Sequence, residues 1–341
     1  MAGIGHEVVT TEAAPRFEVS RIGDAPILVP SMDERMGANL AGPSLIRAPE
    51  WLPDRLGEYY LYFAHHNGTY IRLAVADAIE GPWRIHTPGA LQHAESHFPD
   101  ELDPQDPAKV RPGYVVSTPH IASPDVHVDE ERREIRMYFH GINRDRTQVT
   151  RAATSKDGVH FTAYEPVLGR SYFRGFEYGG WYYGQAMPGI FYRSRDPLGP
   201  FEEGPTLFSS NMRHSALLLE GDTLTVFYTN VGEEPPEKIL ATTIDLRPDW
   251  MEWQTGPVST VLEPERDYEG ADLPLVTSIR GEISDRARQL RDPAIYAEDG
   301  RLFLLYAVAG ESGIALAELK RADQDVAPNS PGAGAEGSRA T

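Results

Sequence analysis

Carboxylates and histidines stand where short strands are expected to begin, and together they can perform acid and base chemistry. The residues concerned are Asp125, Glu177, Asp292, His120 and His214. A carboxylate can take a proton from water, and an imidazole beside a carboxylate keeps a proton near neutral pH and can donate it. We therefore predict Asp125 and Asp292 as catalytic carboxylates. The predicted proton donors are His120, Glu177 and His214.

A second set of polar residues is predicted to bind the substrate. These residues are Ser44, His65, His66, Arg144, Arg174, Arg213 and Arg291. The planar fork of arginine fits carboxylate or sulfate groups, and four arginines exceed what two carboxylates would neutralise. This excess indicates an anionic substrate.

Structural roles compete with these assignments. Asp125 could cap a turn or bind backbone amides of the neighbouring repeat. Glu177 could form a salt bridge with Arg174, and Arg291 could neutralise Asp292. The residue types alone leave both kinds of role open.

A repeated pattern of strands must position these side chains. Each copy has a polar opening strand, a turn, an aromatic strand and a third strand. The first and third copies end in a Gly-Pro-aromatic segment, and the second ends in Asp157-Gly158 with Phe161 shortly after. The five copies begin near residues 43, 124, 174, 214 and 291. Repetition on this scale is typical of a propeller. The sequence therefore predicts an all-β fold, a five-bladed β-propeller whose aromatic strands pack between blades.

The fifth copy lacks an outer strand, because the chain nearly ends after its third. Residues 1–41 contain two apolar stretches, 8–9 and 27–29, that could supply this strand and close the ring. Closure removes exposed strand edges. We expect residues 1–321 to form one domain. Residues 322–341, rich in Pro, Gly, Ala and Ser, are expected to be a disordered tail.

In a propeller, the starts of the innermost strands and the loops after the second strands lie on one face. The loops concerned are 65–67, 141–145, 187–188, 230 and 310–312. Strand openers facing the axis are partly buried, and a buried ionisable group needs a partner or a use. The predicted site is therefore an axial pocket on this face.

Two blade starts carry a family resemblance. Ser123-Pro124-Asp125-Val126-His127 and Arg291-Asp292-Pro293-Ala294-Ile295, each followed by an aromatic strand, resemble those of the five-bladed propeller glycosidases of family 43 and their relatives. The resemblance spans residues 40–320. In that family an Asp of the first blade is the base, an Asp of the second tunes the acid, a Glu of the third is the acid, and a fourth-blade His often lies near an axial metal or water.

Carried over residue by residue, the resemblance assigns Asp125 to the second-blade Asp and His214 to the fourth-blade His. Ser44 stands where the base is expected, and Arg174 stands at the third-blade equivalent of Asp125. Glu177 lies three residues further along. The implied function is hydrolysis of a glycosidic bond in an oligosaccharide by carboxylate and histidine groups, on an acidic sugar if the arginines face the pocket. The alternatives are a phosphorylase or lyase, or a non-catalytic sugar-binding propeller.

No cofactor is required for this chemistry, although a metal remains an expectation. An axial calcium would suit oxygen ligands, and a cluster of Asp125, His120 and His127 would suit a transition metal. Motifs typical of nucleotide binding, zinc proteases and serine hydrolases do not occur in the sequence.

Charge and composition limit the partners. Among 341 residues, 51 are acidic and 32 basic, which gives a net charge of −19. This charge opposes binding to nucleic acid or anionic lipid. The sequence lacks an apolar run of about 18 residues and a recognisable signal peptide, so we expect a cytoplasmic protein without membrane contact. The oligomeric state is left open, and the absence of cysteine rules out disulfides.

Overall fold

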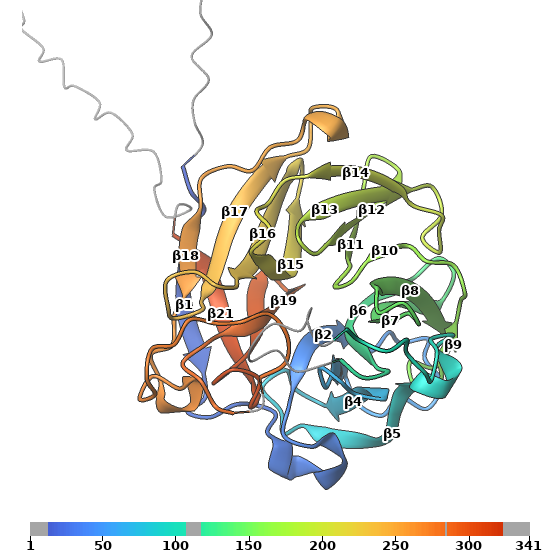
Figure 1. Ribbon diagram of the computed structural model, residues 1–341, viewed down its shortest axis with the longest axis horizontal. Coiled ribbons are helices and arrows are strands. Elements are labelled where there is room, and N and C mark those ends of the chain that lie inside the picture. Colours follow the sequence, from blue (N-terminus) through green and yellow to red (C-terminus); the bar gives the residue numbers. More distant parts are fainter. Residues whose placement is uncertain (1–12, 107–116, 284, 323–341) are drawn as a thin grey trace, which may run out of the picture.

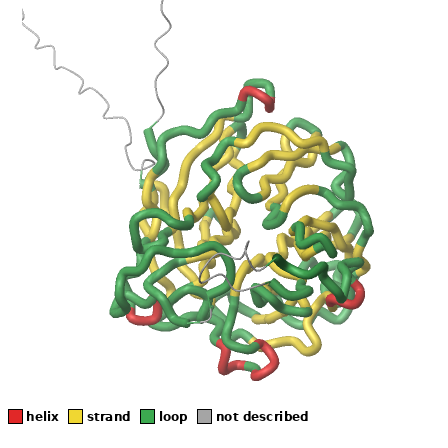
Figure 2. The backbone as a smooth tube through the Cα atoms, in the orientation of Figure 1, coloured by secondary structure: helices red, strands yellow, loops and turns green. Residues whose placement is uncertain are grey.

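The computed structural model describes residues 13–106, 117–283 and 285–322. In these ranges the strands form five small sheets around a common centre, as Figure 1 shows. The predicted all-β, five-bladed propeller is confirmed. Figure 2 shows the few short helices on the outside of the ring. No helix in the described ranges is long and apolar enough to cross a membrane.

Each of the first four blades is a run of consecutive antiparallel strands. Blade 1 consists of β2 (Ala41–Arg47), β3 (Tyr59–Ala64), β4 (Tyr70–Ala76) and β5 (Arg84–Gln92). Blade 2 consists of β6 (Ile121–Asp129), β7 (Glu134–Ile142) and β8 (Gln148–Ser155), with β9 (Thr162–Ala163) and β10 (Gly169–Arg170) on its outer edge. Blade 3 consists of β11 (Arg174–Tyr178), β12 (Trp181–Ala186), β13 (Ile190–Ser194) and β14 (Glu202–Thr206). Blade 4 consists of β15 (Met212–Glu220), β16 (Thr223–Asn230), β17 (Ile239–Asp245) and β18 (Ser259–Leu262).

The fifth blade joins the two ends of the chain. Its strands are β19 (Arg291–Glu298), β20 (Arg301–Ala307), β21 (Ile314–Arg321) and β1 (Phe17–Ile22). The closing strand does come from residues 1–41, but neither predicted stretch forms it. Residues 8–9 lie outside the described ranges, and Leu28 makes only an isolated bridge to Ile314. The tail predicted at 322–341 lies, from residue 323 on, outside the described residues.

Side chains of the second strands fill the spaces between blades. Tyr62 and Phe139 belong to the apolar cluster between blades 1 and 2, while Phe63, from the opposite face of the same strand as Tyr62, belongs with Leu305 to the cluster between blades 1 and 5. Successive strand residues face opposite sides of a sheet, so one aromatic strand contributes to two interfaces. The aromatic strands therefore serve packing, as predicted.

The backbone has an unusual conformation where each inner strand begins. Gly42, Ser123, Tyr172, His214 and Asp292 all have positive φ, between 47° and 60°. Four of the five inner strands also shift register directly after this point. Residues other than glycine rarely adopt this backbone conformation, which costs them about 1–3 kcal/mol and occurs often at functional sites. These five residues, hereafter the opening ring, mark equivalent positions in the five blades.

Candidate active site

The opening ring corrects the alignment of blades made from the sequence. His214 and Asp292 belong to this ring, whereas Ser44, Asp125 and Arg174 lie two residues further along their strands. The first-blade member is Gly42, and a Cβ there would lie 2.8 Å from the Cα of Ser123. The first blade therefore cannot place a carboxylate in the ring. Asp292 is its single carboxylate.

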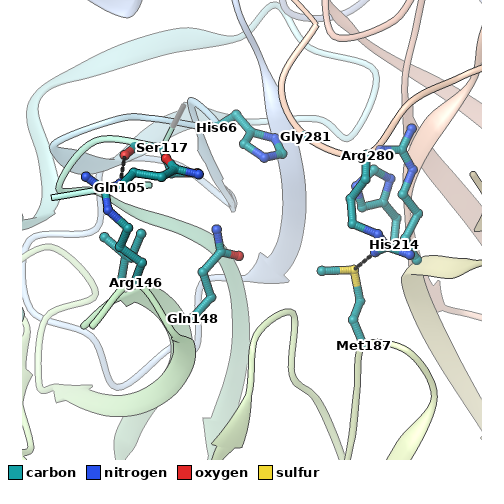
Figure 3. Close-up of a pocket in the computed structure, with 11 residues that line it drawn as sticks. His66, Gln105, Ser117, Arg146, Gln148, Met187, His214, Arg280 and Gly281 are labelled. Atoms are coloured by element: carbon teal, nitrogen blue, oxygen red, sulfur yellow. Dashed lines mark hydrogen bonds between the residues drawn. The ribbon is translucent and has the colours of Figure 1, made fainter. Parts of the chain in front are cut away.

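A cavity of about 300 Å³ lies at the opening ends of the inner strands. Its lining includes His66, Arg146, Gln148, Met187, His214 and Arg280. Figure 3 shows His214 and Arg280 close together on one side of the cavity, and Arg146 with Gln105 on the other. His66, Ile142 and Met187 come from the second-to-third-strand loops that the sequence predicted. Arg280 and Gln105 come from the insertions before blades 5 and 2. We call this cavity the upper pocket.

Asp292 lies directly behind His214. His214 Nδ1 is 3.8 Å from Asp292 Oδ2, and the Tyr172 hydroxyl donates a hydrogen bond of 2.7 Å to Asp292 Oδ1. Asp292 is only 2% exposed and Oδ2 accepts no hydrogen bond from the described residues. Burial, with a contribution from Glu311, raises the pKa of Asp292 to about 6. Asp292 does not line the upper pocket, and His214 lies between its carboxylate and the cavity lining as its nearest pocket residue among those described.

The two histidines that line the upper pocket have opposite pKa shifts. Burial lowers the pKa of His214 well below its usual value, and Arg213 and Arg291 lower it further. Burial also opposes protonation of His66, but the Glu311 carboxylate, 3.7 Å from His66 Nδ1, raises its pKa above the usual value. Environments that separate the pKa values of two groups in one site are typical of an acid and base pair.

Buried ion pairs behind the upper pocket connect the first residues of the inner strands of blades 4 and 5 to neighbouring loops. Glu237 accepts two hydrogen bonds from Arg213, at 2.9 and 2.5 Å, and lies 3.5 Å from Arg291. Arg291 also donates to Glu311, at 2.7 Å, and Glu311 accepts a hydrogen bond from Asn39. Arg213 and Arg291, predicted to bind substrate, are thus paired with Glu237 and Glu311, two carboxylates that were not among the predicted site residues.

Several predicted residues lie away from the upper pocket. Asp125, Ser44 and Arg174 line a separate cavity further along the axis. Glu177 is an exposed residue, 63% of its side chain being accessible, and it lies 3.4 Å from Arg136 rather than pairing with Arg174. Arg144 is exposed and lies 3.6 Å from Glu101. The structure thus separates Asp125 and Glu177 from Asp292 and His214.

The remaining predicted histidines are structural neighbours of the pocket. His120 is fully buried, its Nδ1 lies 2.7 Å from the Thr118 carbonyl, and burial lowers its pKa to about 4. His65 Nδ1 accepts a hydrogen bond from the Asn67 amide, and its Nε2 lies 4.0 Å from Glu282. At neutral pH His120 is therefore unprotonated, which disfavours it as a proton donor.

The donor groups on the axis do not fit the expected metal. Asp125 is the carboxylate of the axial cavity, and it already accepts hydrogen bonds from His127 and from the Gly175 amide beside the Arg174 guanidinium. A divalent cation needs several oxygen ligands and would be repelled by this arginine. Within the described residues, no group of three or more His, Asp or Glu side chains could hold a metal ion.

The fold is the five-bladed propeller of the family-43 glycoside hydrolases. A thermostable family-43 glycoside hydrolase superposes with a TM-score of 0.51 and 14% identity, over 88% of this chain and 97% of that one. A β-xylosidase/α-arabinofuranosidase from a compost microbial metagenome, solved with xylotriose, gives 0.54 and 11%, over 89% and 95% of the two chains. At these identities the likeness shows the fold. No protein-family model matches the chain.

The sequence itself has a closer relative. An uncharacterized protein of Acanthamoeba polyphaga mimivirus is 35% identical over 309 residues, which cover 83% of this chain and 84% of the viral protein. The chain therefore belongs to the same family as this viral protein.

Proposed function

We propose that the protein hydrolyses a glycosidic bond in an acidic oligosaccharide, and that the reaction takes place in the upper pocket. The observation that supports this proposal is the pair of pocket histidines with opposite pKa shifts, one of them backed by a buried carboxylate. The fold gives a precedent, because solved proteins with this fold are glycoside hydrolases.

In the proposed reaction His214 is the base and His66 is the acid. His214 is neutral at pH 7 and takes a proton from the attacking water, while the Asp292 carboxylate, 3.8 Å from His214 Nδ1, stabilises the imidazolium that forms. His66, whose pKa is raised by Glu311, donates a proton to the oxygen of the leaving sugar. A positioned acid or base typically contributes a factor of about 100 to 10,000 to the rate.

The charge of the lining supports an acidic sugar. Three arginines and two histidines line the upper pocket, and none of its described lining residues is a carboxylate. Arg213 is paired with Glu237, but Arg146 donates to the backbone carbonyls of Asp103 and Ser117, which carry no formal charge. In a protein of net charge −19, a cationic cavity favours an anionic ligand.

The test is a panel of oligosaccharides in matched neutral and acidic forms, with release of reducing sugar as the readout. We expect turnover of acidic members, and a loss of about 100-fold or more in kcat/KM for His214→Gln and His66→Gln. The control is His160→Gln, because the His160 side chain is 86% exposed. Full activity of His214→Gln would contradict the proposed mechanism.

The same panel separates the alternatives. Added phosphate would yield sugar phosphate only from a phosphorylase. Binding without turnover would support a sugar-binding propeller, a function favoured by the lack of a carboxylate among the described residues of the pocket lining.

A further inference from the structure

A second cavity lies on the propeller axis, further along the inner strands than the upper pocket. It has a volume of about 150 Å³, and all five inner strands line it, with Ser44, Asp125, Arg174, Ala216 and Ala294 among the lining residues. None of its lining residues belongs to the upper pocket. At about 30 Å³ per water molecule, its volume corresponds to roughly five waters.

This cavity presents a carboxylate and a guanidinium side by side. Asp125 Oδ2 accepts hydrogen bonds of 2.7 Å from His127 Nε2 and from the Gly175 amide, whereas Oδ1 lies 3.7 Å from Arg174 Nη1. Arg174 is 3% exposed and donates to the carbonyls of Ser215 and Pro124, but its Nη2 has no hydrogen-bond partner among the described residues. Such a buried donor is costly unless a ligand or water satisfies it.

An aromatic cavity adjoins this one. Its volume is about 250 Å³, and it shares His127 and Gly175 with the first cavity. The half-buried Phe176 and Tyr182 form its accessible aromatic part, and Tyr138 lies buried behind them. Arg136, whose guanidinium lies over the Tyr138 and Tyr182 rings, and Glu177, 3.4 Å away, form its charged edge. We call the two cavities together the axial site.

The charges of the axial site are balanced. Asp125 faces Arg174, and Glu177 faces Arg136. A charged ligand would disturb both pairs, whereas a hydroxyl group can donate to a carboxylate and accept from a guanidinium. Two neighbouring hydroxyls would satisfy Asp125 Oδ1 and Arg174 Nη2 together. An aromatic wall suits the apolar face of a sugar ring.

We propose that the axial site binds an uncharged sugar residue, with adjacent hydroxyls between Asp125 and Arg174 and the ring against the aromatic side chains. The site is distinct from the upper pocket and does not depend on hydrolysis there. Asp125 and Glu177, which do not line the upper pocket, would thus take part in sugar binding at the axial site.

The test is titration of the whole protein with D-xylose, D-glucose and D-glucuronate, followed by ligand-observed NMR. We expect an uncharged sugar to bind, and Asp125→Asn and Tyr182→Ala each to weaken its binding by about tenfold or more. His214→Gln, in the upper pocket, should leave this binding unchanged. The matched control is Tyr178→Ala, a tyrosine of the same blade whose hydroxyl contacts Asp222 outside both cavities.

Three results would overturn the proposal. The first is that neither D-xylose nor D-glucose binds. The others are sugar binding that is unchanged in both Asp125→Asn and Tyr182→Ala, and sugar binding that is lost in His214→Gln. Because Tyr182 is half-buried, Tyr182→Ala gives an answer even if Asp125→Asn fails to fold. A protein that is inactive on every oligosaccharide but binds xylose in this way would contradict only the proposed hydrolysis.

Discussion

The pKa values of Asp292, His66 and His214 are shifted in different directions although the three residues lie close together, because each has different charged neighbours. Asp292, with its pKa raised to about 6 by burial and by Glu311, is ionised at neutral pH. The same Glu311 raises the pKa of His66, whereas burial and two arginines lower the pKa of His214 well below its usual value. Glu311 thus raises the pKa of His66, the proposed acid, and that of Asp292, the carboxylate beside the proposed base.

The pH dependence of kcat/KM should therefore be bell-shaped. Activity is expected to rise as pH increases through about 6, where Asp292 loses its proton, and to fall above the raised pKa of His66. Glu311→Gln removes a charge that raises both pKa values, so both limbs should move to lower pH. Full pH profiles of the two proteins measure this, and an unchanged profile in a folded variant would refute the role of Glu311.

Tyr172→Phe provides an opposite shift. The Tyr172 hydroxyl donates to Asp292 and lowers its pKa. Without it, the acidic limb should move to higher pH while the alkaline limb, set by His66, stays in place. A shift of the alkaline limb instead would show that Asp292 and His66 are wrongly assigned.

At the scale of the elements, strand positions could be predicted better than the residues that face the axis. The third repeat, predicted to begin near residue 174, does begin with β11 at Arg174. The register of the blade starts was wrong because a left-handed residue and a bulge precede the regular strand. A sequence signal was present: Pro43, Pro124 and Pro293 align Gly42, Ser123 and Asp292 as equivalents.

The ion pairs behind the pocket could not be predicted in the same way. Glu311 lies in the 310–312 loop predicted on the pocket face, but its pairing with Arg291, 20 residues away, and that of Glu237 with Arg213, 24 residues away, depend on the path of loops around the whole ring. Arg146 and Arg280 reach the upper pocket from a turn and an insertion without regular structure. Spacing along the chain carries no information on contacts of this kind.

Gly42 should be among the least replaceable residues of blade 1. Gly42→Ala places an alanine at φ 58° and a Cβ 2.8 Å from Ser123. Gly221 has nearly the same φ, 60°, with nothing within 4 Å of its Cβ position, so Gly221→Ala isolates the conformational cost of about 1–2 kcal/mol. Urea denaturation should show a larger loss for Gly42→Ala, and equal losses would exclude the predicted clash.

Glu237 should matter for stability more than any exposed ion pair. Glu237→Gln leaves two buried arginines undercompensated, which typically costs about 3–5 kcal/mol. Glu263→Gln breaks the half-exposed pair with Lys238 and should cost less than about 1 kcal/mol. Equal losses of unfolding free energy in Glu237→Gln and Glu263→Gln would contradict this prediction.

At the scale of the whole molecule, the ring depends on contacts between the ends of the chain. Strand β1 pairs with β21 from Phe17 opposite Arg321 to Ile22 opposite Leu316. Val19 also joins the apolar cluster between blades 4 and 5. Pairing with β1 covers the outer edge of β21, which would otherwise be exposed in the last blade.

Removal of β1 should therefore destabilise the entire propeller. A chain that begins at Gly23 is expected to unfold at lower denaturant concentration and to aggregate through the exposed edge of β21. A chain that begins at Ala13 keeps β1 and serves as the control. Equal unfolding midpoints for the two chains, measured by circular dichroism, would show that closure contributes little.

The proposed chemistry requires that an acidic sugar binds in the upper pocket between His66 and His214. A crystal structure of the protein with bound D-glucuronate would show where such a sugar lies. The sugar is predicted to lie in the upper pocket, with its carboxylate near Arg146 or Arg280 and a hydroxyl near His214. Glucuronate found in the axial site, or outside both cavities, would contradict the account.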